Sequence, residues 1–302
     1  MVTEEVRVLH ELEELVKSKI PSAKSVGFYQ TGFVYVNQRV IGLSLRKKGL
    51  SFLPESIGTL THLQKLYLRD NHLKAFPESI CNLRNLLDLD IFNNQVNSLP
   101  ENIDNLVNLQ RADLSRNPLQ YLPENIGKLE SLQRLGLYDV ELKAFPETIG
   151  KLPNLWDLAA FQNQLTSLPE SIGDLPKLQR LSLNNNRLTE LPESIGHLSN
   201  LRELHLNGNK LTSLPESIGN LTRLEKLGLE KNQLTALPES IGNLQTLKGL
   251  RLERNPLTTL PASITQLQNL ERFRLGIKKF EPLREEVKKW LSALKVAGCE
   301  IR

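Results

Sequence analysis

The sequence predicts an α/β solenoid in which short strands form a long parallel sheet, and two observations support this. First, leucine recurs with a period of 23 residues, without insertion or deletion, from Leu63 and Leu86 through to Leu270. Second, each unit repeats an LxLxx segment in which apolar and exposed residues alternate, as in a strand with one buried face. One short strand cannot bury its leucines alone, so neighbouring units must stack. We therefore predict one continuous repeat domain.

Each unit follows the form LxxLxLxxNxLxxLPESIGxLxx, which is clearest between Leu201 and Asn220. This pattern resembles the leucine-rich repeat, and its LPESIGxL segment is similar to the intracellular repeats of Ras-pathway scaffolds, Scribble-type polarity proteins, Roco proteins and multi-copy prokaryotic repeat proteins. The resemblance implies a leucine-rich-repeat solenoid, a curved horseshoe with a parallel concave sheet. It also implies a protein-binding scaffold, with a signalling protein such as a small GTPase among the partner classes.

Two further residue types in the repeat have structural interpretations. Asparagine recurs where the chain leaves the strand, and its carboxamide can satisfy backbone groups of the turn. The PESIG segment predicts a short helical or 3₁₀ turn that ends at glycine. Because Cys81, Asp104 and Thr265 replace that glycine, its backbone conformation is not one that only glycine adopts. The recurring glutamate of PESIG fits the N-termini of these turns.

Both ends of the array need a cap, because a terminal repeat would expose leucines to water. Residues 1–39 predict a helix ended by Pro21 and a β-hairpin with turns at Thr31-Gly32 and Asn37-Gln38. Residues 40–280 hold about ten and a half repeats. Residues 281–302 predict a capping helix that starts at Pro282. The apolar faces of the two helices are predicted to consist of Val6, Leu9, Leu12, Val16 and Ile20, and of Leu283, Val287, Trp290, Leu291 and Leu294.

Composition narrows the classes of function. The 38 lysines and arginines exceed the 34 acidic residues by only four, which does not favour nucleic acid as the main partner. Cys81 and Cys299 are the only cysteines, so no disulfide framework is predicted. The first twenty residues lack the apolar core of a signal peptide or membrane span. We expect a cytoplasmic protein.

Catalysis is not predicted. Neither cysteine has a histidine and carboxylate partner that the sequence can identify. The five histidines show no metal-ligand spacing, and no glycine loop is suited to phosphate cradling. The sequence therefore predicts a non-catalytic chain without cofactor or metal.

A candidate binding site follows from the exposed strand positions, where the repeats differ. In the seventh column of the repeat, aromatic residues occur at Phe92, Tyr138 and Phe161, and neighbouring strands lie about 4.8 Å apart. These rings are expected to form one patch, which Tyr67 extends. Aromatic and arginine anchors with polar surroundings are typical of interface centres. We predict that a protein partner binds the concave face of repeats 2–6 through Tyr67, Asp88, Asp90, Phe92, Arg111, Asp113, Arg134, Tyr138, Asp157 and Phe161.

Two alternatives stay open. The aromatic patch is either a site for a different protein or a homodimer surface, and scattered exposed aromatics are also ordinary. Towards the C-terminus the concave face is basic and lacks aromatic stacking partners. That surface fits an acidic ligand or, less well, nucleic acid. It consists of Arg251, Arg254, Arg272, Arg274, Lys278 and Lys279.

Overall fold

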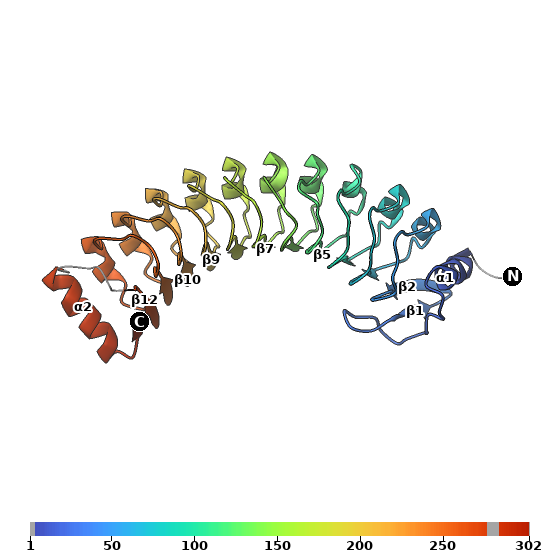
Figure 1. Cartoon of the computed structure of the whole chain (residues 1–302), viewed down its shortest axis with the longest axis horizontal. Helices are drawn as coiled ribbons and strands as arrows, with labels where there is room; N and C mark the ends of the chain where they lie inside the picture. Colours follow the sequence, from blue (N-terminus) through green and yellow to red (C-terminus); the bar gives the residue numbers. More distant parts are fainter. Residues whose placement is uncertain (1–3, 277–283, 302) are drawn as a thin grey trace. The chain divides into compact units, whose positions relative to one another are not determined.

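The computed structural model describes residues 4–276 and 284–301. The chain forms two compact units. The first unit contains Met1–Leu142 and Lys151–Leu155, and the second contains Lys143–Gly150 and Trp156–Arg302. In each unit the strands follow one another along one side and short 3₁₀ turns lie on the opposite side (Figure 1). We call these sides the strand face and the turn face.

The first unit begins with a helix, α1 (Glu4–Leu15), and an antiparallel hairpin of β1 (Gly32–Val36) and β2 (Arg39–Ser44). Asn37 and Gln38 both have left-handed φ values of 49° and 62°, as a two-residue hairpin turn requires, so that predicted turn is confirmed. The helix ends before Pro21, because Lys17 adopts φ 49°. The buried carboxylate of Glu5 accepts a hydrogen bond from the Val40 amide and thereby joins α1 to the hairpin.

Parallel strands continue the first unit after the hairpin. They are β3 (Lys65–Tyr67), β4 (Asp88–Asp90), β5 (Arg111–Asp113) and β6 (Arg134–Gly136). Each of them pairs in parallel with the strand of the preceding repeat. The turns opposite them are η1 (Glu55–Thr59), η2 (Glu78–Asn82), η3 (Ile103–Asn105) and η4 (Glu124–Lys128). The repeat therefore builds the predicted strand and 3₁₀ turn.

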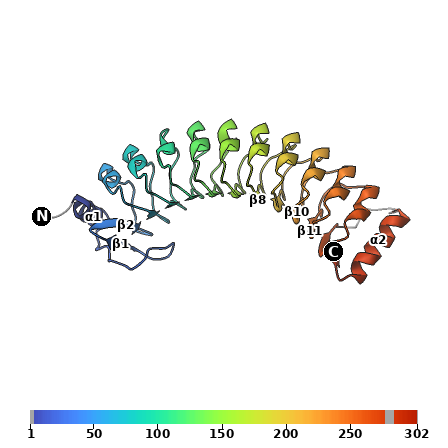
Figure 2. The same cartoon turned by 180° about the vertical axis from the view of Figure 1, so that it is seen from behind.

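The second unit has the same construction (Figure 2). Its strands are β7 (Asp157–Ala159), β8 (Arg180–Ser182), β9 (Glu203–His205), β10 (Lys226–Gly228), β11 (Gly249–Arg251), β12 (Arg272–Arg274) and β13 (Glu300–Ile301). Its turns are η6 (Glu170–Asp174), η7 (Glu193–His197), η8 (Glu216–Asn220), η9 (Glu239–Asn243) and η10 (Ala262–Gln266), while η5 (Glu147–Lys151) has residues in both units.

A capping helix, α2 (Glu285–Val296), packs against η10 at the end of the second unit. Trp290 is buried as predicted: its ring lies 5.5 Å from that of Phe273, and its Nε1–H donates to the Leu267 carbonyl at 3.2 Å. The predicted helix start at Pro282, with Leu283, lies outside the described residues. The chain does not stay helical to its end, since β13 returns and pairs with β12 in parallel.

The asparagine ladder joins most repeats to the one before it, and Val140 takes the asparagine position in one repeat. Asn94 donates through Nδ2 to the Leu68 and Ile91 carbonyls, both at 2.9 Å, and its Oδ1 accepts from the Leu73 amide at 3.0 Å. Asn209 makes the equivalent bonds in the second unit. Since an unpaired buried carbonyl is costly, these contacts fix the register between repeats. The predicted structural role of these residues is confirmed.

Glutamates of the PESIG segment also make contacts between repeats. The carboxylate of Glu55 accepts from the backbone amide of Ser79, one repeat later, at 3.2 Å. Glu216 and Ser240 repeat this contact in the second unit at 3.1 Å. These bonds satisfy amides at the N-termini of turns, which would otherwise have no acceptor within the turn. The structural interpretation of the PESIG glutamates is thus supported at these positions.

The turn glycine is required by close packing rather than by φ. A Cβ at Gly58 would lie 2.5 Å from the Ser79 carbonyl oxygen of the next turn. Where Cys81 replaces this glycine, the following turn departs from the regular form. Asn102 adopts φ −89° and ψ 24°, and η3 is shortened to Ile103–Asn105. Cys81 is buried at this position.

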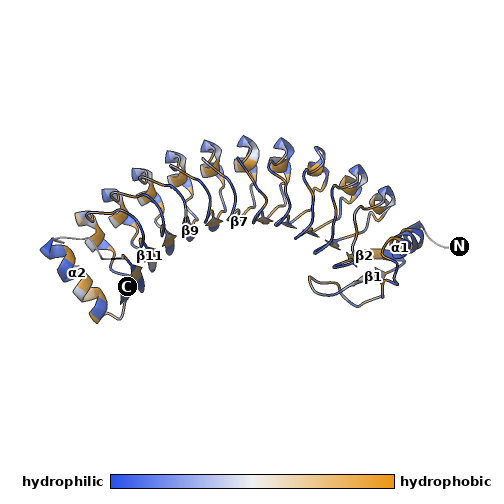
Figure 3. Ribbon diagram, in the orientation of Figure 1, coloured by the Kyte–Doolittle hydropathy of each residue, from blue (hydrophilic) through white to orange (hydrophobic). Residues whose placement is uncertain are grey.

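The core of each unit lies between its strands and turns. Figure 3 shows hydrophobic segments recurring in the strands and turns, and α1 and α2 each carry both hydrophobic and hydrophilic residues. In α1 the buried apolar residues are Val8, Leu9 and Leu12. Val8 was not among the predicted residues, while the predicted Val6 is only partly buried. In α2 the buried residues are Val287, Trp290 and Leu294, all of them predicted.

Two glycines of the second unit test this packing. A Cβ at Gly196 would lie 2.4 Å from the Ser217 carbonyl oxygen, whereas one at Gly249 meets nothing closer than 3.9 Å. We expect Gly196→Ala to lower the free energy of unfolding by about 1–3 kcal/mol through overpacking. Gly249→Ala should leave it unchanged or raise it by up to about 1 kcal/mol. Urea denaturation followed by circular dichroism measures both, and equal effects would contradict the close-packing explanation.

Candidate protein-binding site

The strand face of the first unit presents side chains in columns, because successive strands pair exactly one repeat apart. Two residues after β3, β4, β5 and β6 come Arg69, Phe92, Ser115 and Tyr138, respectively. The residue that follows each of them adopts a left-handed conformation, with φ between 54° and 57°, as at Arg116. These two positions in each repeat build the site.

Aromatic rings and arginines alternate across this face. The Arg69 guanidinium lies 5.7 Å from the centroid of the Phe28 ring and 4.2 Å from that of Phe92. Arg116 lies 5.3 Å from the centroid of Phe92 and 5.4 Å from that of Tyr138. We call these five residues the arginine–aromatic ladder. Such cation–π contacts hold both partners in place while leaving them open to solvent on one side.

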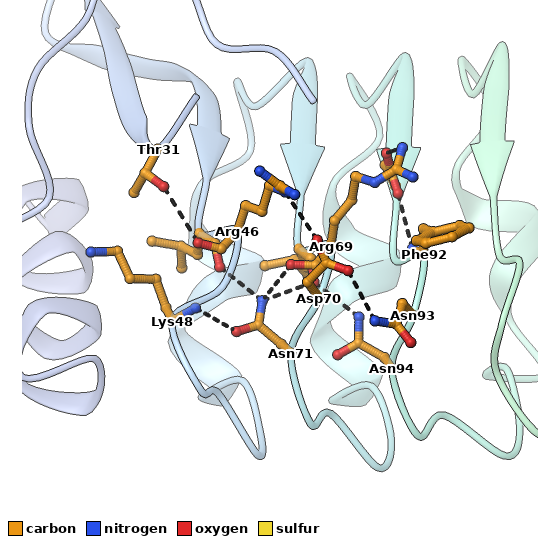
Figure 4. A network of polar contacts seen from close by, with 12 residues as sticks. Thr31, Arg46, Lys48, Arg69, Asp70, Asn71, Phe92, Asn93 and Asn94 are labelled. Carbon is orange, nitrogen blue, oxygen red and sulfur yellow. Dashed lines mark hydrogen bonds and ion pairs between the residues drawn. The ribbon is translucent and has the colours of Figure 1, made fainter. Parts of the chain in front are cut away.

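Acidic side chains hold Arg69 of the ladder. Asp90 accepts from Arg69 Nη1 at 3.0 Å, and its other oxygen accepts from the backbone amide of Phe92 at 2.9 Å. One buried carboxylate therefore positions both a guanidinium and the ring beside it. Asp113 adds a longer ion pair to Arg69 at 3.9 Å. Figure 4 shows Arg69 and Phe92 with the neighbouring polar network.

A third arginine, Arg46, lies at the start of the same face. It donates through Nε to Asp70 at 3.0 Å, and Asp70 also accepts from Asn93 Nδ2 at 2.9 Å (Figure 4). Burial opposes ionisation of Asp70, but these hydrogen bonds outweigh it and lower its pKa. The guanidinium of Arg46 lies 5.4 Å from the ring centroid of Tyr29, which is 80% exposed.

Asp90 is the most perturbed carboxyl group of this site. Asp90 is only 1% exposed. Burial raises the pKa of its carboxyl group to about 7, and the negative charge of Asp113 adds to this increase. The hydrogen bonds from Phe92 and Arg69 oppose this increase. The group can therefore take up a proton near neutral pH, which would remove the charge that holds Arg69.

Tyr67 corrects our expectation of an exposed patch that includes it. The residue is 4% exposed and packs in a small apolar cluster with Val26 and Val34, and the Phe28 ring lies 5.1 Å away. The loop before β1 covers it. Burial, together with the charge of Asp88, raises the pKa of its hydroxyl to about 12. Tyr67 thus supports the ladder from below and does not present contact area itself.

The other predicted residues of the first unit differ in their exposure to solvent. Asp88 is buried, not exposed as we expected, and it binds the guanidinium of the exposed Arg111 through both carboxylate oxygens. Arg134 on β6 is exposed, and Asp113 on β5 is partly buried. Tyr138 is partly buried, with its backbone amide held by Ser115 Oγ at 3.0 Å and its hydroxyl 3.3 Å from Arg116 Nη2.

Asp157 and Phe161 belong to the second unit. Asp157 is buried on β7, contrary to our expectation, while Phe161 is partly buried. The sequence-based hypothesis that Phe161 continues the patch of Phe92 and Tyr138 stays a prediction.

Sequence reasoning missed Phe28, Tyr29 and Arg116. The two aromatics lie outside the repeats, in a loop between Gly27 and Gly32, so no column contains them. Their signal was a pair of adjacent aromatic residues between glycines in a loop. Arg116 occupies the eighth column beside the aromatic seventh column, and only the structure shows that it lies between two rings.

Within the described ranges 4–276 and 284–301, no cluster of three or more histidine, cysteine or acidic residues could hold a metal ion. In the same residues no helix is long and apolar enough to cross a membrane. The site instead combines rings, guanidinium groups and carboxylates on a row of strands.

Comparison with known proteins places this solenoid in a family. The model of the leucine-rich repeat region matches residues 40–115 and 158–230. A leucine-rich repeat protein of Leptospira interrogans is 32% identical over 86% of this chain and 83% of that chain, with a TM-score of 0.52. A comparison with curated proteins finds no match. The chain belongs to the leucine-rich repeat family.

Two other solved structures show the fold in complexes. The ectodomain of the Arabidopsis thaliana receptor kinase GASSHO1/SCHENGEN3, in complex with CASPARIAN STRIP INTEGRITY FACTOR 2, is 30% identical over 82% of this chain, with a TM-score of 0.69. This chain spans 31% of that receptor. The FLRT2 repeats, in a complex with Latrophilin 3 and Unc5D, match at 23% identity over 84% of this chain and 79% of that chain, with a TM-score of 0.67. Leucine-rich repeats with this fold are in general protein-interaction modules rather than catalysts.

The raised pKa of Asp90 predicts a pH-dependent stability. The pKa of Asp90 is near 3.8 in the unfolded chain and about 7 in the folded protein. Between these two pH values the folded protein keeps a proton on Asp90 that the unfolded chain has lost. The free energy of unfolding therefore decreases as pH rises through it, by up to about 4 kcal/mol from this group. Urea denaturation of the wild type and Asp90→Asn at pH 4 and pH 7 measures the difference.

The variant isolates Asp90 from the other carboxyl groups. Asp90→Asn should become more stable relative to the wild type as pH rises from 4 to 7. Asp113→Asn should weaken the wild-type trend, because the Asp113 charge contributes to the shift. Parallel stability curves for the wild type and Asp90→Asn would contradict the assignment.

Proposed function

We propose that this chain is a non-catalytic scaffold that binds a protein partner on the strand face of its first unit. The observation that carries the proposal is the arginine–aromatic ladder, in which each guanidinium group lies 4.2–5.7 Å from the centroids of the two rings beside it. Aromatic and arginine side chains are the residues most enriched at the energetic centres of protein interfaces. The protein complexes formed by the matched family members support the same class of function.

The proposed contact surface consists of the exposed parts of the ladder and of Tyr29, Arg46, Arg111 and Arg134. Arginines and aspartates are both numerous here, so the surface has no single strong sign of charge. We therefore infer a partner that contributes apolar and polar contacts together, rather than a strongly acidic or basic chain. Family resemblance adds a small GTPase as one candidate.

Phe161 and Asp157 remain part of the proposed site as sequence predictions. Self-association through the same surface is the alternative to a different partner. A cytoplasmic location also stays a proposal. The buried free thiols of Cys81 and Cys299 are compatible with it.

Affinity capture with three forms of the chain tests the proposal. Phe92→Ala removes the central ring of the ladder, and Phe52→Ala removes the same side chain from a residue that is 52% exposed and outside the ladder. We expect a partner retained by the wild type and Phe52→Ala to be lost with Phe92→Ala. In a purified pair, Phe92→Ala should weaken the Kd by about thirtyfold or more, as for a hot-spot residue worth at least ~2 kcal/mol.

The folding of each variant is checked first by circular dichroism, since Phe92 is partly buried. Sedimentation velocity of the purified wild type identifies self-association directly. Partners bound equally by all three forms, with equal Kd values, would overturn the proposed location.

A further inference from the structure

A basic hollow lies on the strand face of the second unit. It has a volume of about 150 Å³ and is formed along β9, β10, β11 and β12. Gly228 and Gly249 are among its lining residues, and its cationic lining includes Lys226, Arg251, Arg272 and Arg274. This volume suits one compact chemical group rather than an extended chain.

The hollow lies over Gly249, at a strand position where most other repeats carry a side chain. At Gly228 the place of a Cβ is already taken by the Asn207 side chain, whose nearest atom would lie 2.8 Å away. In the sheet, Gly249 pairs with Lys226 on one side and with Arg272 on the other, while Gly228 pairs with Arg251. A Cβ at Gly249 would meet nothing closer than the Lys226 Cγ at 3.9 Å. Three cationic residues, Lys226, Arg251 and Arg272, thus surround a position where the backbone is uncovered.

Positive charge is in excess around this position. The carboxylate of Glu203 forms ion pairs with Arg180 and Lys226, each with an N–O distance of 2.8 Å. The carboxylate of Glu225 forms ion pairs with Arg202 at 2.6 Å and with Lys248 at 3.2 Å. Two carboxylates therefore neutralise only half of these four cations.

Arg251 and Arg272 add to this excess. Among the described residues neither has a carboxylate within 4.0 Å, and both are exposed. Arg274 has Glu253 only at 4.0 Å, and the carboxylate of Glu271 also lines the hollow and offsets one charge. Glu300 pairs with Arg272 across the sheet and adds a fifth carboxylate. Including Arg180 and Arg202, seven cations face five carboxylates, so a ligand with about two negative charges would balance the excess.

We propose that this hollow binds a phosphate group over the backbone of Gly249, between Lys226, Arg251 and Arg272. A phosphate monoester carries a charge of about −1.5 to −2 at neutral pH, and the guanidinium fork matches its oxygens. No Phe, Tyr or Trp is among the described residues that line the hollow, and the imidazole of His205, which does line it, lies 3.2 Å from the Glu203 carboxylate. The hollow therefore lacks the large stacking rings typical of single-stranded nucleic-acid sites. This site is distinct from the surface of the first unit and does not depend on its function.

Isothermal titration calorimetry at fixed low ionic strength tests the proposal with defined probes. These are inorganic phosphate, a short peptide of glycines around one phosphoserine, the same peptide without phosphate, and a single-stranded oligonucleotide. We expect the phosphorylated peptide to bind and the unphosphorylated peptide not to bind. Tighter binding of the phosphopeptide than of inorganic phosphate identifies a phosphorylated macromolecule as the source, and equal binding identifies free phosphate.

Three variants locate the site. Arg272→Gln removes one guanidinium group and should weaken phosphate binding by about tenfold or more. Gly249→Val fills the hollow, where space for its first side-chain atom is available, and should abolish binding without removing a charge. Arg187→Gln is the control, because it removes an exposed arginine of the same unit that does not line the hollow. Circular dichroism confirms that each variant is folded.

The proposal is overturned by any of three results. The first is no phosphate-dependent binding at millimolar concentration of either phosphate probe. The second is equal binding by the wild type, Arg272→Gln and Gly249→Val. The third is an oligonucleotide that binds more tightly than the phosphopeptide and is unaffected by Gly249→Val, which would assign the basic surface to nucleic acid instead.

Discussion

The structure depends on one constraint, that backbone groups buried where the chain leaves each strand must find hydrogen-bond partners. An asparagine in each of most repeats meets this need by donating to carbonyls of its own repeat and of the one before it, as Asn94 and Asn209 do. Its oxygen accepts from an amide of the preceding repeat as well. Because the same residue bridges the same atoms each time, the strands pair without slippage. The columns of the strand face exist only because this register is kept.

The candidate binding site uses that register for another purpose. Side chains one repeat apart lie next to each other, so an arginine of one repeat contacts the ring of the next, as Arg69 does with Phe92. The carboxylate of Asp90 connects this surface to the interior, since it is buried and still binds both of these residues. A buried carboxyl group therefore positions two neighbouring residues of the exposed ladder.

The sequence predicted the parts of this structure that repeat. The strands, the 3₁₀ turns, the asparagine ladder, the hairpin turn at Asn37-Gln38 and the buried Trp290 all follow from period, turn chemistry or an apolar stripe. It did not predict the burial of Tyr67, because the residues that cover it come from a loop outside the repeats, with Phe28 beside its ring. The irregular η3 was also unpredicted, because a strict sequence period predicts the same form for every turn, whereas Asn102 departs from it.

The arginines of the ladder have a further consequence for association. Arg69 and Arg116 each lie against two rings before any partner is present. An arginine on an ordinary surface samples many rotamers and loses that freedom when it is bound. Here much of the loss has occurred during folding, so a partner would meet side chains that are already ordered. Complexes on such a surface are expected to owe their affinity to slow dissociation more than to rapid encounter.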